Sequence, residues 1–184
     1  MVSFGEGLDK ALERTFTRPI PKSAGAQMRY LVKQYKGTRA VAALLGISQR
    51  TVERYVKDEI RRPRPQLAAA MEREVRKRWQ PQVRAKARKT ATTTDGIMVD
   101  TRARFGYTAA PGTTDDARLR HLTVALPPHY AARLFEAQEQ GASERELREI
   151  TAEALGEVYF RDNGRRAHGL TVEYTDLEHV EFDL

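Results

Sequence analysis

Residues 38–57 read TRAVAALLGISQRTVERYVK, and the fold of the N-terminal half follows from this stretch. Apolar residues recur at helical spacing on both sides of Gly46, which is typical of two short amphipathic helices. Gly46 stands where a left-handed residue would close the first helix, and Ser48 stands where a hydroxyl would cap the second. Two short helices with a glycine turn predict a helix-turn-helix, in which the second helix enters the DNA major groove.

The outward face of that second helix supplies the first set of candidate DNA contacts. They are Ser48, Gln49, Arg50, Thr51 and Arg54. Those at the start of the helix stand at its base-reading end, where polar side chains can reach base edges. A plain helical hairpin in a bundle is the alternative. The glycine turn, the cap, the small Ala42 and the basic face agree better with DNA binding.

Charge is distributed unevenly along the 184 residues. Residues 1–94 hold 22 Lys/Arg against 8 Asp/Glu, a net of +14, whereas residues 95–184 hold 10 against 17, a net of −7. A basic half next to an acidic half indicates nucleic-acid contact on the N-terminal side only. The chain has no cysteine, no apolar run of 18 residues and no signal-peptide pattern at its start, so we expect a cytoplasmic location.

The remaining sequence predicts an α+β protein in three parts. Residues 1–80 are expected to form an all-α helix-turn-helix domain, with a short amphipathic helix near the N-terminus and a last helix ending near Pro81. Residues 81–96 read as a basic, flexible linker. The basic residues of this linker and of the last turn of the helix before it are predicted to form a phosphate-contacting arm. Contacts with the DNA backbone add affinity without sequence information. The candidate residues of this arm are Arg76, Lys77, Arg78, Arg84, Lys86 and Arg88.

Residues 97–184 are expected to form a small α+β domain. Alternating apolar residues predict one strand from Ile97 to Phe105 and another from Leu122 to Leu126, joined by a long loop over residues 106–118. Two helices follow, the second capped by Ser143, and the tail alternates twice. The tail therefore predicts either two more strands or one bulged strand.

No catalytic motif for a free-standing enzyme is present: no glycine-rich phosphate loop, no HExxH pair and no GxSxG elbow. The four histidines are scattered along the chain and are expected to be surface residues rather than metal ligands. The loop over residues 106–118 does carry two hydroxyls, Thr113 and Thr114, followed directly by Asp115 and Asp116. A hydroxyl on such a loop could be delivered into another enzyme's active site, with the carboxylates as auxiliary groups, whereas a simple turn cap is the alternative.

Five segments together closely resemble the telomere-protecting terminal proteins of linear Streptomyces-type chromosomes and plasmids. They are QRTVERYVK, EVRKRWQPQVRA, TRARFGYTA with GTTDDAR, LPPHYAARLFEAQE and VEYTDLEHVEFDL, in the same order and across essentially the whole chain. The resemblance implies a DNA-binding protein that becomes covalently attached to the 5′ end of telomeric DNA. It also implies that Thr114, the second threonine of GTTDDAR, accepts the first deoxynucleotide as a protein primer.

The same resemblance implies the partners and cofactors. A telomere-associated protein would recruit the chain to the 3′ overhang of telomeric DNA, at replicon ends in the nucleoid. A DNA polymerase would catalyse the transfer, with dCTP as the expected nucleotide and Mg²⁺ bound by the polymerase. No intrinsic cofactor, metal site or membrane contact is expected. Residues 122–159 also resemble the ribbon-helix-helix pattern, which implies a homodimer. A helix-turn-helix transcription regulator with a C-terminal dimerisation domain is the alternative function.

Overall fold

The computed structural model describes residues 3–108, 114–161 and 171–184, without the side chains of residues 107–108, 114–117, 171 and 173. The chain divides into two compact units. The helical unit is Thr17–Pro81, and the sheet unit combines Met1–Phe16 with Gln82–Leu184. The predicted α+β class is confirmed, because the described residues hold many helices and a three-stranded antiparallel sheet.

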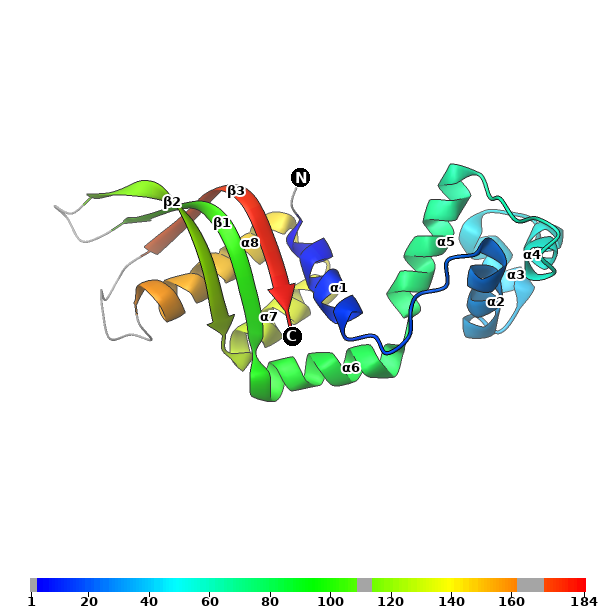
Figure 1. Cartoon of the computed structure of the whole chain (residues 1–184), viewed down its shortest axis with the longest axis horizontal. Helices are drawn as coiled ribbons and strands as arrows, with labels where there is room; N and C mark the ends of the chain where they lie inside the picture. The colour runs from blue at the N-terminus through cyan, green and yellow to red at the C-terminus, as the bar shows by residue number, and fades with distance from the viewer. Residues whose placement is uncertain (1–2, 109–113, 162–170) are drawn as a thin grey trace. The chain divides into compact units, whose positions relative to one another are not determined.

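The helical unit contains α2 (Ala24–Gln34), α3 (Thr38–Leu45), α4 (Gln49–Val56) and α5 (Pro65–Arg78), as Figure 1 shows. Its core is formed by apolar side chains that recur every three or four residues on these helices. The buried members are Ala24, Met28, Leu31, Val41, Ala42, Val52, Tyr55, Met71 and Val75. Because every helix buries one face, the helices hold each other in place.

The turn between α3 and α4 has the conformation that the sequence predicts. Gly46 is left-handed, with φ 62° and ψ 34°, a conformation that costs glycine no steric strain. The Ile47 N–H donates to the Ala42 carbonyl over 3.0 Å, which closes α3. The Ser48 hydroxyl then accepts from the Thr51 N–H over 3.1 Å, which caps α4.

The sheet unit is built on β1 (Ile97–Thr108), which pairs on one side with β2 (Thr114–Leu126) and on the other with β3 (Thr171–Asp183). Alternate residues of each strand face a core that they share with α1 (Phe4–Arg14), α7 (Pro128–Glu139) and α8 (Glu144–Leu155), as Figure 1 shows. Strand residues in this core are Ile97, Val99, Ala103, Phe105, Leu122, Val124, Leu126, Tyr174, Val180 and Phe182. The opposite face of the sheet carries mainly polar and charged side chains, among them Asp100, Arg102 and His121, together with the exposed Met98.

The N-terminal helix α1 belongs to the sheet unit, which corrects the predicted boundary of a domain over residues 1–80. Its residues Leu8 and Leu12 are fully buried in the core of the sheet unit. The ring of Phe4 lies 6.0 Å from that of Tyr174 and 6.2 Å from that of Phe182, centroid to centroid. An amphipathic helix is stable only where its apolar face is covered, and β3 and α8 provide that cover.

The predicted flexible linker over residues 81–96 is also corrected. Its residues form α6 (Pro81–Thr90) and a π-helical turn, η1 (Ala91–Asp95). Ala91 is buried in the core of the sheet unit, and Ala87 packs against the same core. Alanine residues four apart give a narrow apolar stripe, which the high density of basic residues obscures in the sequence.

Strands β1 and β2 both extend into the loop predicted over residues 106–118, which corrects the bounds of that loop. Backbone pairing continues past a register shift near Phe105 as far as Thr108 opposite Thr114. The alternation of apolar and polar residues in the sequence ends at Phe105, because the β-bulge at this register shift changes which residues face the core. The tail is one strand, β3, with a second register shift where Asp176 has a positive φ of 45°. Of the two alternatives for the tail, the bulged strand is therefore the correct one.

Candidate functional site

The outward face of α4 is the best-defined candidate site among the described residues. Val52 and Tyr55 are buried in the helical core, so residues on the opposite side of the helix face solvent. Arg50 is exposed and has no ion-pair partner among the described residues. Arg54 is also exposed and donates from Nε to the Glu59 carboxylate over 3.2 Å. The face therefore presents one unpaired guanidinium and one guanidinium that a carboxylate already holds.

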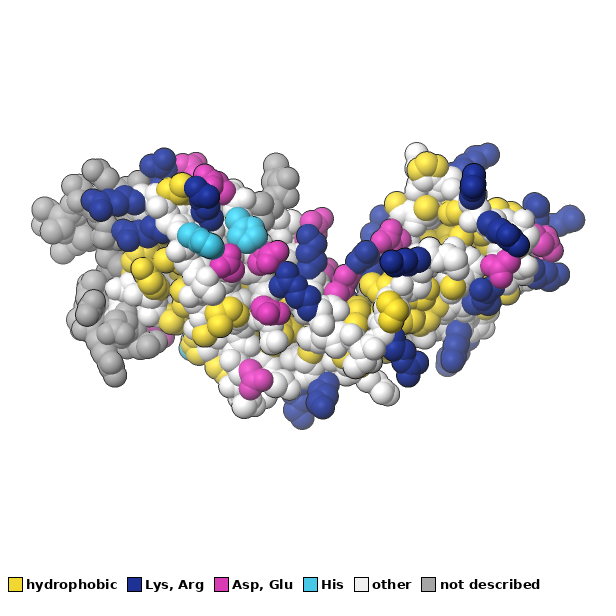
Figure 2. Space-filling view, viewed as in Figure 1, with side chains coloured by type: hydrophobic (Ala, Val, Ile, Leu, Met, Phe, Trp, Pro, Cys, Tyr) yellow, Lys and Arg dark blue, Asp and Glu magenta, His cyan; other side chains and the backbone are white. Residues whose placement is uncertain are grey.

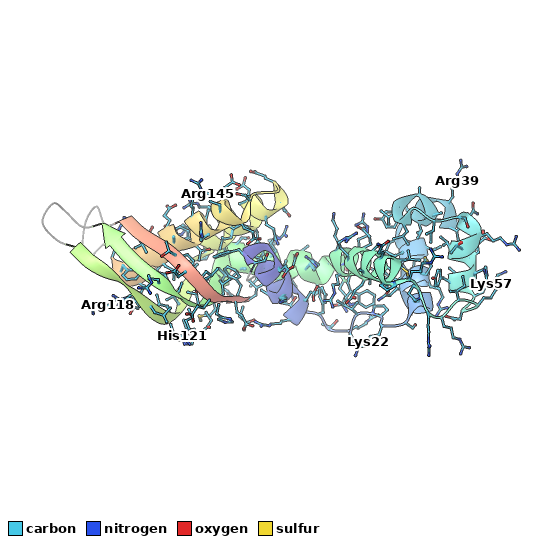
Figure 3. The ribbon with its side chains drawn as sticks, turned by 90° about the horizontal axis from the view of Figure 1, so that it is seen from above. Lys22, Arg39, Lys57, Arg118, His121 and Arg145 are labelled. Atoms are coloured by element: carbon cyan, nitrogen blue, oxygen red, sulfur yellow. The ribbon has the colours of Figure 1, made fainter. Side chains whose placement is uncertain are left out.

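The polar residues at the start of α4 are held by each other. Gln49 donates from its amide to the Glu53 carboxylate over 3.0 Å, one helical turn away. Ser48 and Thr51 share a hydroxyl–hydroxyl hydrogen bond of 2.8 Å in addition to the cap. The hydroxyls at the N-terminus of α4 are thus fixed in position. In Figure 3 the side chain of Lys57 projects away from the same unit.

The far end of α4 is fixed by a close approach to α2. Gly25 of α2 lies so near Asp58 that a Cβ atom added there would come within 1.8 Å of the Asp58 carboxylate. Arg29 of α2 donates to the same carboxylate over 2.7 Å and to the Val56 carbonyl over 2.8 Å. The orientation of the outward face therefore depends on α2 as well as on the turn before α4.

The predicted arm residues on α5 differ in whether their side chains already have partners within the protein. Arg76 pairs with Glu72 over 2.8 Å, one turn earlier on the same helix. Arg78 lies 3.6 Å from Glu74, and its guanidinium stacks 4.5 Å above the Tyr35 ring centroid. Lys77 is exposed. Lys77 is the member of this group that is best suited to contact a phosphate.

On α6, the structure separates the predicted arm into a structural side and an exposed side. Arg84 is mostly buried and donates to Asp9 of α1 over 2.9 Å. Arg88 pairs with Glu139 of α7 and stacks 5.0 Å above the Phe135 ring centroid. Burial, and secondarily the charge of Arg84, lowers the pKa of the Arg88 guanidinium. Lys86 is exposed. Arg84 and Arg88 therefore bind α6 to the sheet unit, and their role as phosphate contacts stays a prediction.

The candidate acceptor lies at the first residue of β2. The backbone of Thr114 pairs with that of Thr108, and the backbone of Asp115 pairs with that of Tyr107. Asp116 is also in β2, and Thr113 lies outside the described residues. The side chains of the threonine and the two aspartates are among those that the structure does not describe. The backbone thus places all three residues at the end of the β1–β2 hairpin where the chain passes from β1 to β2, opposite the end formed by Ile97 and Leu126.

A cluster on the open face of the sheet was not predicted from the sequence. Asp100 of β1 lies 3.0 Å from the Nε2 of His121 on β2 and 3.3 Å from the Nε2 of His179 on β3. The Thr123 hydroxyl donates to the same carboxylate over 2.6 Å. The hydrogen bonds from Thr123 and His121 lower the pKa of Asp100. Figure 2 shows histidines beside acidic side chains on this face, and Figure 3 labels His121.

Only strand register could have identified this cluster. Its two histidines are 58 positions apart in the sequence, yet both pair with Arg102 through the backbone. Alternation in β1 does place Asp100 on the polar face, but nothing local shows which residues flank it. Among the described residues, no group of three or more acidic or histidine side chains is arranged to hold a metal ion. The prediction that the histidines are surface residues agrees with the exposure of His121.

Comparison with known proteins identified no related protein: no family model, no curated protein and no solved structure matches this chain. Within the parts of the chain that the structure describes, no helix has the length and apolar character needed to cross a membrane.

Proposed function

We propose that the chain is a DNA-binding terminal protein and that its helical unit binds DNA as a helix-turn-helix. The observation that carries DNA binding is the outward face of α4, which presents Gln49, Arg50 and Arg54 while Val52 and Tyr55 dock the helix. A helix held by one face and basic on the other fits the major groove. Thr17–Pro81 holds 16 Lys/Arg against 5 Asp/Glu, a net of +11, which favours a polyanionic partner.

We further propose that the protein primes DNA synthesis at the ends of a linear replicon, with Thr114 as the acceptor. The support is the resemblance of the GTTDDAR segment, residues 112–118, to the acceptor motif of the terminal proteins. The partners are telomeric DNA with a 3′ overhang, a telomere-associated protein and a DNA polymerase. This function places the protein at replicon ends in the nucleoid.

The chemical step asked of this chain is a single phosphoryl transfer. The Thr114 hydroxyl oxygen attacks the α-phosphorus of a deoxynucleoside triphosphate, expected to be dCTP. A bond forms between the threonine oxygen and that phosphorus, the bond to the β-phosphate oxygen breaks, and pyrophosphate leaves. The hydroxyl proton passes to a base of the polymerase or to water. The polymerase supplies Mg²⁺ and positions the nucleotide, so the chain itself acts as a substrate.

The test is transfer of radiolabelled dCMP to the protein by the polymerase, in the presence of the telomere-associated protein and an overhang template. We expect Thr114→Ala to abolish labelling and Thr113→Ala, the matched control, to retain much of it. Normal labelling of the Thr114→Ala protein would show that the acceptor is wrong. Thr113 and Tyr107 would then be the next residues to replace.

A helix-turn-helix transcription regulator is the second candidate, since α4 would serve a regulator equally well. The two functions differ in whether the protein leaves DNA. DNA isolated from cells without protease should retain a terminal protein on its 5′ ends through detergent and high salt. A regulator would be washed off by the same treatment. Attachment that is sensitive to both protease and base would decide for the terminal protein.

A further inference from the structure

The segment between α4 and α5 carries three arginines that the outward face of α4 does not include. Residues 60–64 read IRRPR and have no regular secondary structure. Arg62 and Arg64 each precede a proline, which biases both toward extended backbone. Arg64 has φ −61° and ψ 149°, the conformation of an extended polyproline strand. We call residues 61–64 the arginine segment.

The arginine segment is anchored at its start and exposed along its length. Ile60 packs against the core of the helical unit, whereas Arg61, Arg62 and Arg64 are exposed. None of the three guanidiniums has a carboxylate partner among the described residues. Since the structure neutralises none of these three cations, they are available to a polyanion.

The segment also begins directly beside the candidate DNA-reading helix. Glu59 accepts from the Arg54 guanidinium over 3.2 Å, and its N–H donates to the Arg54 carbonyl over 2.9 Å. Arg54 stands on the outward face of α4. The chain that leaves α4 is therefore attached to the edge of the face that would lie in the major groove.

An extended, arginine-rich chain fits a different part of DNA from a helix. The minor groove is only about 6 Å wide, too narrow for a helix but wide enough for a guanidinium or an extended chain. Runs of A·T pairs narrow it further and strengthen its negative potential, which attracts arginine. The guanine N2 amino group obstructs the floor of the groove. These properties predict a preference for pairs that lack this amino group.

We propose that the arginine segment enters the minor groove next to the major groove that α4 occupies, and so selects pairs without a guanine N2 amino group. This inference rests on the proposed function, that the helical unit binds DNA. Contact with phosphates alone is the competing outcome. It would add affinity to every sequence equally.

The experiment compares binding of the full chain to three short duplexes of equal length, made of alternating A·T, I·C or G·C pairs. Inosine lacks the N2 amino group, so I·C and G·C present the same major groove and differ only in the minor groove. We expect the wild-type protein to bind I·C and A·T duplexes at least about fivefold more tightly than G·C, the effect of one unfavourable pair. A minor-groove ligand such as netropsin should compete with the protein.

Two variants distinguish entry of the arginines into the minor groove from simple attraction between their positive charge and DNA. The R61K/R62K/R64K protein keeps every charge, but lysine is more strongly hydrated and a poorer fit to the groove. We expect it to lose the preference for I·C over G·C while keeping the salt dependence. Lys10→Ala, which removes an exposed cation from α1, should leave the preference intact. Urea unfolding of each variant verifies that the fold is preserved.

The outcomes separate this inference from the proposed function on which it rests. Equal binding of I·C and G·C duplexes by the wild-type protein would overturn groove entry and leave DNA binding in place. The same conclusion follows if the lysine variant keeps the full preference. Failure of the wild-type protein to bind any of the three duplexes at low salt would overturn both the DNA-binding function and this inference.

Discussion

At the scale of single residues, Glu144 has a role that its position in the chain conceals. It is the first residue of α8, yet its carboxylate accepts hydrogen bonds from the first backbone N–H groups of α1. Phe4 donates over 2.6 Å, Gly5 over 3.1 Å and the Ser3 hydroxyl over 2.7 Å. A carboxylate at a helix N-terminus satisfies free donors and favours the helix dipole. Glu144 therefore caps a helix about 140 residues away.

We expect Glu144→Gln to lower the free energy of unfolding by about 1 kcal/mol, the usual value of an N-terminal cap. Burial alone would raise the pKa of Glu144, but the three hydrogen bonds outweigh it and lower the pKa. The stabilisation should therefore be complete above the unfolded pKa of about 4.3 and be lost as the pH falls through the folded value. Urea unfolding of both proteins across a pH series measures this difference.

The control for this prediction is Glu149→Gln, on the same helix. Glu149 forms an exposed pair with Arg145 over 2.8 Å, and such pairs contribute little. A change below about 0.5 kcal/mol is expected for it. If the two variants were equally stable at neutral pH, the capping role of Glu144 would be wrong.

At the scale of elements, α6 combines a structural face and a solvent face in one basic helix. Arg84, Ala87 and Arg88 turn toward α1 and α7, whereas Lys86 and Lys89 are exposed. The long stems of arginine cover apolar surface while their charges are paired. A basic helix can thus be held by its arginines and still offer its lysines to a partner.

This division predicts different effects for the two faces of α6. Arg88→Ala should destabilise the sheet unit by roughly 1–2 kcal/mol, because it removes a pair with Glu139 and uncovers the Phe135 ring. Arg88→Met, which keeps the stem, should cost less. Replacing Lys86 and Lys89 by alanine should leave stability unchanged within about 0.5 kcal/mol. Thermal unfolding of the three proteins tests these differences.

The protein with alanine at positions 86 and 89 should also bind DNA less tightly, by the same factor on every sequence. Removing one lysine from a phosphate should reduce the slope of log affinity against log salt by about 1. An unchanged salt slope would show that α6 does not bind DNA.

At the scale of the whole molecule, positive charge is concentrated in one unit. The helical unit has a net charge of +11, and the sheet unit, with 16 Lys/Arg against 20 Asp/Glu, has a net of −4. In the sequence, the helical unit follows Phe16 and precedes Gln82, so it interrupts the chain of the sheet unit. The basic unit contains the candidate recognition helix, and the acidic one contains the candidate acceptor. DNA recognition and nucleotide acceptance are therefore expected to be separable.

Arg50→Ala tests this separation. Removing this guanidinium should weaken DNA binding by roughly 1–3 kcal/mol, because Arg50 is exposed and unpaired among the described residues. Labelling of Thr114 with saturating template and polymerase should remain at the wild-type level. Binding is measured by fluorescence anisotropy across a salt series, and labelling by radiolabelled dCMP. If the Arg50→Ala protein binds DNA normally, Arg50 on α4 does not contribute to recognition, and the recognition surface lies elsewhere. A variant that binds poorly and also cannot be labelled at saturation would mean that the helical unit helps to form the priming site.

The sequence by itself determined the features that depend on neighbours a few residues away. Gly46 closes α3 and Ser48 caps α4 because a turn and a cap need only the adjacent backbone. Likewise, the capping box of Ser143 with Glu146 and the alternation from Ile97 to Phe105 are visible in the chain. Helical and strand periodicity report on one element at a time, so α+β composition could be predicted.

Only the tertiary structure decided which distant segments meet. Nothing near α1 shows that its apolar face packs against β3 rather than α2, since either surface would cover it. The same holds for Arg88 on Phe135 and for the two histidines beside Asp100, whose partners lie on other elements. Such pairings are decided by strand register and by the arrangement that buries the most apolar surface. Those are properties of the whole folded chain, which local patterns do not contain.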